Sequence, residues 1–185
     1  MLAYVFWHFP RPEIEVPAYE RSLLDFHAAL SEAGAEGFVG SASFRVQGAP
    51  WINQGADAYA DWYLLEGSFA LDPLNEVAVS GPRRPGHDPA AAAAASGAGG
   101  LYRLMEGDAD AQGAAAELWL TKPRSTSYDD FYGWARPLAR AAGGGLWRRQ
   151  MVLGPAPEFC LLAASGVGLP AGVEAIEVGR APLAV

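Results

Sequence analysis

One order of predicted elements occurs twice in this chain, and this repetition limits its possible folds more than any single motif does. In the first copy, a strand at residues 62–66 leads through a turn at 71–76 to a short strand at 77–80. In the second copy, an apolar strand that begins at Glu158 leads through Leu169 and Pro170 to a strand that ends on Gly179. Two such units in 185 residues are expected to share one core.

The segments that precede these strands repeat as well. Residues 2–9 are apolar on both faces, as in a central strand covered on both sides, and residues 117–121 echo them. Helical spacing predicts a helix that begins near Pro17 and ends at Gly34. A second helix is predicted after Ser127, which resembles a capping residue, and Pro137 should kink or end it. Residues 38–47 and 147–153 alternate as strands do.

Between the two copies lies a connector rich in alanine and glycine. Residues 90–95 are six alanines that follow Asp88 and Pro89, and we predict a short linker helix there, ended by Gly97. Residues 101–106 fit a strand or a helix equally well. The expected division is therefore a first repeat at 1–81, a linker at 82–115 and a second repeat at 116–185.

Two copies of strand, helix, strand, strand, weak helix and strand resemble the tandem ferredoxin-like arrangement of the dimeric α+β barrel superfamily. The resemblance spans Leu2–Ser80 and Glu117–Val178. It implies an α+β fold of two ferredoxin-like βαββ(α)β repeats, whose antiparallel sheets face each other as a pseudo-dimeric α+β barrel. The superfamily includes antibiotic-biosynthesis monooxygenases, stress-responsive barrel proteins and haem-binding chlorite dismutase-like enzymes. The scaffold therefore permits several functions and selects none.

Composition excludes some partners. The chain is 51% hydrophobic and 18% charged, which excludes a disordered protein. Its 13 basic and 21 acidic residues give a net charge of -8, so we expect neither nucleic acid nor an anionic membrane surface as a partner. The single cysteine, Cys160, lies in an apolar run and is expected to be buried. We expect a cytoplasmic protein, because residues 2–9 are too short for a signal peptide and no apolar run reaches about 18 residues.

His8 is the candidate catalytic residue. It shares a strand face with Tyr4 and Phe6, and its counterpart in the second copy is Leu120, so the repeat loses its symmetry at one polar position. Such a histidine suits proton transfer or substrate binding, although a histidine bonded to backbone at a strand end is the simpler alternative. The three histidines of the chain are dispersed without ligand spacing, so we expect no metal and no cofactor.

Five further residues are candidate ligand-binding residues. Arg45 and Arg148 occupy the polar faces of corresponding strands, which either point into the barrel interior and bind an anionic or carbonyl group or simply face solvent. The second copy has no counterparts of Trp62, Tyr63 and Asn75. We therefore expect these residues to serve the function rather than the repeated scaffold.

These patterns favour a protein that binds a small, largely apolar molecule in a barrel pocket. A cofactor-independent monooxygenase or isomerase would fit that description. The alternative is a non-catalytic barrel that acts through self-association or through a protein partner. The expected assembly is a monomer with an internal pseudo-dimer or a homodimer.

Overall fold

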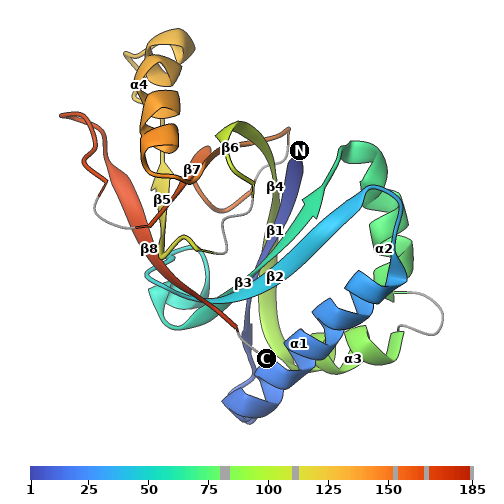
Figure 1. Cartoon of the computed structure of the whole chain (residues 1–185). Helices are drawn as coiled ribbons and strands as arrows, with labels where there is room; N and C mark the ends of the chain where they lie inside the picture. Colours follow the sequence, from blue (N-terminus) through green and yellow to red (C-terminus); the bar gives the residue numbers. More distant parts are fainter. Residues whose placement is uncertain (80–83, 110–112, 152–153, 165–166, 184–185) are drawn as a thin grey trace.

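The computed structural model describes the whole chain except residues 80–83, 110–112, 152–153, 165–166 and 184–185 (Figure 1). Its strands are β1 (Leu2–Pro10), β2 (Phe38–Gln47), β3 (Ala58–Leu65), β4 (Ala94–Gly107), β5 (Ala116–Leu120), β6 (Gly145–Arg149), β7 (Phe159–Ala163) and β8 (Ala175–Pro182). Its α-helices are α1 (Val16–Ala33), α2 (Leu71–Val79), α3 (Arg84–Ala93) and α4 (Tyr128–Ala141), and two short 3₁₀ turns lie at Asn53–Gly55 and Ser68–Ala70.

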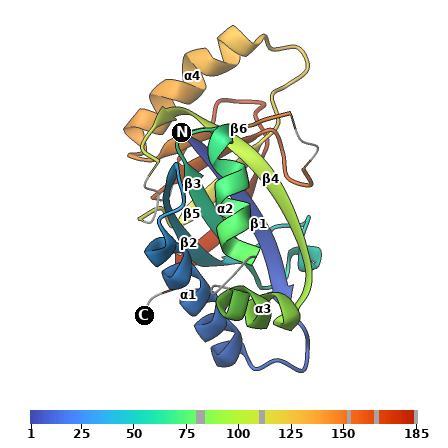
Figure 2. The same ribbon diagram turned by 90° about the vertical axis from the view of Figure 1, so that its right-hand side faces the viewer.

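The strands form one closed antiparallel barrel in the order β1-β3-β2-β8-β5-β7-β6-β4. Two pairings, β2 with β8 and β4 with β6, join strands from the early and late parts of the chain. Helices α1, α2 and α3 lie together over β1 and β3, whereas α4 lies apart from them near β5, β6 and β7 (Figures 1 and 2). The expected α+β fold with an antiparallel barrel is therefore confirmed.

The strand predicted at residues 77–80 is wrong, because Val77–Val79 form the last turn of α2, while Ser80 lies outside the described residues. Helical spacing explains the difference. Leu71, Leu74 and Ala78 recur at intervals of three and four residues, and all three pack into the cluster beneath the helix. An apolar triplet at the end of such a pattern continues the helix.

The alanine-rich connector contains a strand that sequence patterns did not predict. The helix predicted over residues 90–95 ends at Ala93, and from Ala94 the chain pairs with β1 along almost its whole length. Residues 101–106, for which strand and helix fitted equally, belong to the same strand, β4. Long-range pairing overrides the helix propensity of alanine here. The predicted boundary at residues 81 and 82 lies outside the described residues.

Helix α4 does not end early at its proline. It runs from Tyr128 to Ala141 with Pro137 inside it, so the expectation of an early end is wrong, whereas a kink at Pro137 stays a prediction. A proline ring collides with the carbonyl four residues earlier, and that residue is Gly133, whose backbone can tilt without moving a side chain. The predicted cap is confirmed, because Ser127 Oγ accepts a hydrogen bond from the Asp130 amide.

The barrel interior is filled mainly by aromatic and aliphatic side chains, but it holds one buried charged pair. Glu117 accepts hydrogen bonds from the indole nitrogens of Trp62 (3.2 Å) and Trp119 (2.9 Å). Arg180 Nη1 lies 3.8 Å from the same carboxylate, and its guanidinium sits 3.5 Å from the centre of the Phe44 ring. Burial raises the pKa of Glu117 and lowers that of Arg180. This cluster joins strands β2, β3, β5 and β8 across the closure of the barrel.

Removing one member of the buried pair should destabilise the barrel strongly. Glu117→Ala leaves the buried Arg180 charge without the carboxylate that lies 3.8 Å from it, and we expect a loss of about 3–5 kcal/mol in the free energy of unfolding, measured with urea. The matched control is Arg140→Ala, which removes a surface pair with Glu106 and should cost about 1 kcal/mol or less. Equal effects of the two substitutions would contradict a structural role for the interior pair.

Candidate active site

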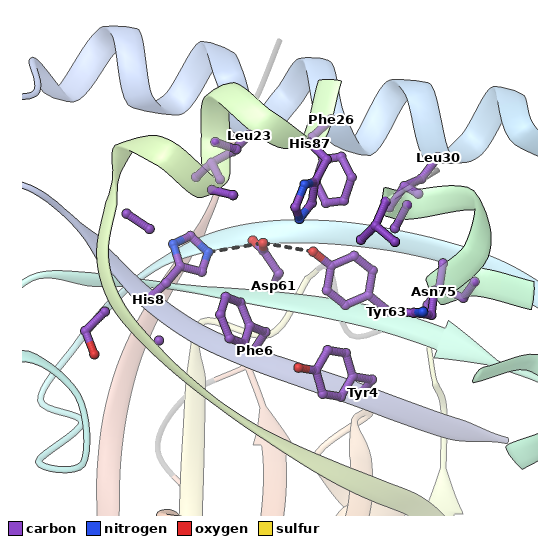
Figure 3. Close-up of a pocket in the computed structure, with 18 of the residues that line it drawn as sticks. Tyr4, Phe6, His8, Leu23, Phe26, Leu30, Asp61, Tyr63, Asn75 and His87 are labelled. Carbon is purple, nitrogen blue, oxygen red and sulfur yellow. Dashed lines mark hydrogen bonds and ion pairs between the residues drawn. The ribbon is translucent and has the colours of Figure 1, made fainter. Parts of the chain in front are cut away.

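A cavity of about 650 Å³ lies outside the barrel, between the sheet and helices α1, α2 and α3 (Figure 3). Its size falls in the range of small-molecule sites. The sheet contributes Tyr4, Phe6, His8, Asp61 and Tyr63, and the helices contribute mainly apolar side chains. The helical wall includes Leu23, Phe26 and Leu30 of α1, Leu71, Leu74 and Asn75 of α2, and His87 and Ala90 of α3.

The alternation of each strand determines which residues reach this cavity. On β1, the even-numbered residues Tyr4, Phe6 and His8 face the helices, whereas Trp7 faces the barrel interior. On β3, Asp61 and Tyr63 face the helices and Trp62 points inward. The polar groups of both strands therefore gather on the outer face of the sheet.

Asp61 is the centre of a buried polar network. Its side chain is 3% exposed, and its carboxylate oxygens lie 3.1 Å from His8 Nε2 and 3.3 Å from His27 Nε2. The Tyr63 hydroxyl donates a hydrogen bond of 3.1 Å to the same carboxylate. Figure 3 shows Asp61 between His8 and Tyr63. One carboxylate thus has three polar partners from β1, α1 and its own strand.

Electrostatics keep Asp61 ionised. Burial alone would raise the pKa of this carboxyl group, but the imidazoles of His8 and His27 outweigh burial and hold the pKa well below its ordinary value. Burial, reinforced by the Asp61 charge, raises the pKa of the Tyr63 hydroxyl well above its ordinary value. The same two causes raise the pKa of Tyr19. The carboxylate is therefore the negative charge of the site, and the phenols stay neutral.

His8 is oriented at both ring nitrogens. Nε2 faces the Asp61 carboxylate, and Nδ1 lies 2.6 Å from the hydroxyl of Tyr19, a residue of α1 that also lines the cavity. A carboxylate accepts hydrogen bonds and cannot donate them, so we assign the hydrogen of neutral His8 to Nε2. Nδ1 is then a proton acceptor, and the Tyr19 hydroxyl donates to it.

Glycines in β4 give the aromatic side chains of β1 their room. A Cβ atom placed on Gly97 would lie 2.2 Å from the Phe6 ring, and one placed on Gly99 would lie 2.7 Å from the Tyr4 hydroxyl. Both distances are far below van der Waals contact. The rings of Phe6 and Tyr4 therefore lie over bare backbone, which leaves the cavity open above them.

The structure brings together three of the six residues singled out from the sequence. His8, Tyr63 and Asn75 all line the cavity, and Figure 3 shows His8 and Asn75 toward opposite ends with Asp61 and Tyr63 between them. Their roles in catalysis and ligand binding remain predictions. His8 is hydrogen-bonded to the side chain of Tyr19 and lies 3.1 Å from that of Asp61, unlike the backbone-bonded alternative.

The other three residues lie elsewhere. Trp62 points into the barrel, where it contacts Trp147 and Glu117. Arg45 is 61% exposed and pairs with Glu20 of α1. Arg148 pairs with Glu158 and lies 4.4 Å from the centre of the Tyr128 ring. The idea that both arginines point into the barrel is wrong, because the alternate residues of β2 and β6, Phe44 and Trp147, occupy the interior.

Three network residues escaped the sequence analysis as site candidates: Tyr19, His27 and Asp61. Tyr19 and His27 lie within the segment predicted as the helix that ends at Gly34, where helical spacing alone accounts for them. Asp61 carried a signal that could have been used, because it is the one charged residue in the apolar stretch 58–65. A buried carboxylate needs partners, and the nearby histidines are the obvious ones.

Two negative findings concern the part of the chain that the structure describes. No group of three or more His, Cys, Asp and Glu side chains there is arranged to hold a metal ion. Within the same residues, no helix has both the length and the apolar character needed to cross a membrane.

Acid should weaken the Asp61 network. The folded-state pKa of Asp61 is depressed, so its stabilising contribution is complete above the unfolded value of about 3.9 and is lost as pH falls below that value. We expect Asp61→Asn to lower the free energy of unfolding by about 3 kcal/mol near pH 5. Urea unfolding of both proteins at pH 5 and at pH 3 checks this, and a difference that grows toward pH 3 would contradict it.

The close approach of Gly97 to the Phe6 ring can also be tested by unfolding in urea. Gly97→Ala forces the Phe6 ring to move and should destabilise the protein by about 1–3 kcal/mol. Gly40→Ala is the control, because a Cβ atom at Gly40 of β2 meets no atom within 4 Å. We expect the control to be neutral or slightly stabilising. An unchanged free energy of unfolding in Gly97→Ala would mean that this contact does not fix the position of the Phe6 ring.

Comparison with known proteins shows similarity at the level of fold. No family model and no curated protein matches the sequence. A crystal structure of a protein from Lactobacillus acidophilus NCFM, whose proposed activity is that of a monooxygenase, superposes with a TM-score of 0.57 at 7% identity over 98% of each chain. An anthrone oxidase-like protein superposes with a TM-score of 0.48 at 7% identity over 97% of this chain and 72% of its own. At such identities, the first match shows a shared α+β barrel fold and nothing finer.

Proposed function

We propose that the protein is an enzyme that binds a small, largely apolar molecule between the sheet and helices α1–α3 and removes a proton from it. The observation that carries this proposal is the buried His8 imidazole, held between the Asp61 carboxylate and the Tyr19 hydroxyl at the wall of an apolar cavity. A carboxylate that orients an imidazole and stabilises its protonated form is a recurring arrangement for general base catalysis.

The proton transfer can be written with these groups. The hydroxyl of a phenol or enol in the cavity gives its proton to the Tyr19 oxygen, while Tyr19 passes its own proton to His8 Nδ1. His8 becomes an imidazolium beside Asp61, and the ligand becomes a conjugated anion. Return of the proton to another ligand atom completes an isomerisation. In a monooxygenation, a carbon of the anion attacks molecular oxygen, which is the oxidant. The resulting peroxide anion takes the proton back from His8 through Tyr19, and loss of water from the hydroperoxide leaves one oxygen atom as a carbonyl group in the product.

The lining of the cavity limits the ligand. Among the described residues that line it there are two aspartates, two histidines and three tyrosines, but no lysine or arginine. A carboxylate or phosphate group would find no permanent positive charge there. An uncharged aromatic molecule with an ionisable hydroxyl group suits this cavity best.

The proposal also covers the relation between the site and the two repeats of the chain. We propose that the two halves of the chain are equivalent units, since the strand order β4-β1-β3-β2 matches β8-β5-β7-β6. Gly34 and Gly143, which follow α1 and α4, have nearly equal φ angles of 61° and 62°. Trp7 pairs with Ala60 as Trp119 pairs with Cys160, which makes Leu120 and Leu161 the counterparts of His8 and Asp61.

The two leucines are buried in the apolar cluster beneath α4. One half would thus keep a filled core where the other carries the polar site. The fold shared with the monooxygenase-like protein agrees with the proposal. The alternative of a barrel that acts through association gains no support, because the barrel closes within one chain.

A phenolic probe tests the proposal. We chose 2-naphthol, whose neutral and ionised forms absorb at different wavelengths, as a small apolar molecule with an ionisable hydroxyl group. We expect it to bind and to be partly ionised at a pH where free 2-naphthol is neutral. His8→Phe and Tyr19→Phe should retain binding within about tenfold but should abolish the naphtholate absorbance.

His87→Gln is the matched control, since His87 lines the same cavity but belongs to a separate contact with Phe26 and Asp88. It should leave the ionised fraction of bound probe unchanged. Binding of 2-naphthol without ionisation in the unaltered protein would refute the proton-transfer role. Absence of binding by 2-naphthol and by larger hydroxylated polycyclic compounds would refute the proposed ligand class.

A further inference from the structure

We infer that His27 is a positioning residue that sets how strongly His8 accepts a proton, because the two imidazoles share the Asp61 carboxylate. The inference rests on the proposed role of His8 as the proton acceptor. His27 does not line the cavity, so it would act on a ligand only through Asp61 and His8.

The geometry of His27 mirrors that of His8. Its Nε2 atom lies 3.3 Å from Asp61 Oδ1, whereas His8 Nε2 approaches the other oxygen, Oδ2. On its far side, His27 Nδ1 lies 2.6 Å from the hydroxyl of Ser41 on β2. A serine hydroxyl that donates to Nδ1 leaves the ring hydrogen on Nε2, the nitrogen that lies 3.3 Å from Asp61. Ser41 and His27 therefore hold the carboxylate from the side opposite to His8.

Sharing the carboxylate weakens its effect on each partner. A carboxylate that faces an additional polar N–H group offers less negative charge to its other partners. His27 therefore reduces the stabilisation that Asp61 gives to protonated His8. Removal of His27 should therefore make His8 a stronger base. Loss of packing that admits water also favours the imidazolium, so a variant that keeps an N–H donor at residue 27 is needed to separate positioning from packing.

Few other groups near Asp61 can change how strongly His8 accepts a proton. The groups near Asp61 are Tyr4 and His8 from β1, Tyr63 from its own strand, and Tyr19 and His27 from α1. His87 of α3 faces the same cavity. The two groups that lower the pKa of Asp61 are His8 and His27.

The test compares His27→Phe, His27→Gln and the unaltered protein with bound 2-naphthol. At a pH where less than half of the bound probe is ionised, we expect His27→Phe to raise the ratio of naphtholate to naphthol about threefold or more. His27→Gln keeps an N–H donor and should stay near the unaltered protein. A ratio that falls or stays the same in a folded His27→Phe protein would overturn the inference.

A second readout needs no ligand. Titration of the Asp61 carboxyl carbon by NMR should show a higher Asp61 pKa in His27→Phe than in the unaltered protein, and a smaller rise in Ser41→Ala, which serves if the Phe variant does not fold. An Asp61 titration that is identical in all variants would refute the role of His27. If the unaltered protein does not ionise 2-naphthol, the proposed function fails, but this titration still decides whether His27 acts on Asp61.

Discussion

The buried charge of Asp61 is the constraint on which the candidate site depends. An ionised carboxylate removed from water must be surrounded by donors or positive groups, because its desolvation otherwise costs several kcal/mol. Here those partners come from β1, from β3 and from α1, so the charge fixes how the first helix sits on the sheet. The orientation of His8, and with it the free acceptor at Nδ1, follows from that arrangement.

The second constraint is the alternation of side chains along each strand. Trp7 and Trp62 fill the closed barrel, while their neighbours His8 and Asp61 face the helices. Because the interior is packed, the space for a ligand lies in the outer layer. Helices α1, α2 and α3 leave a cavity there, whereas Phe131 of α4 packs directly on Phe159 of β7, with ring centres 4.3 Å apart. The two sides of the barrel thus differ in their capacity to bind a molecule.

The sequence predicted most elements whose pattern is local. The first strand, the helix ending at Gly34 and the capping role of Ser127 are confirmed. Strand β4 escaped prediction, because its alanines and glycines have little strand preference and its pairing partner lies about 90 residues earlier. For the site, alternation placed His8 beside Tyr4 and Phe6, but no pattern in one segment could show that His27 and Asp61 meet it. Trp62 and Tyr63 were grouped although neighbouring strand residues must face opposite sides.

The central claim is that Asp61 holds His8 with its hydrogen on Nε2 and its Nδ1 ready to accept a proton. The most direct measurement is nitrogen-15 NMR of the His8 ring in the ligand-free protein, with the signals assigned through His8→Phe. The account predicts that, at a pH where the ring is neutral, Nε2 carries the hydrogen and Nδ1 carries none. A ring with its hydrogen on Nδ1 and a bare Nε2 facing Asp61 would contradict it.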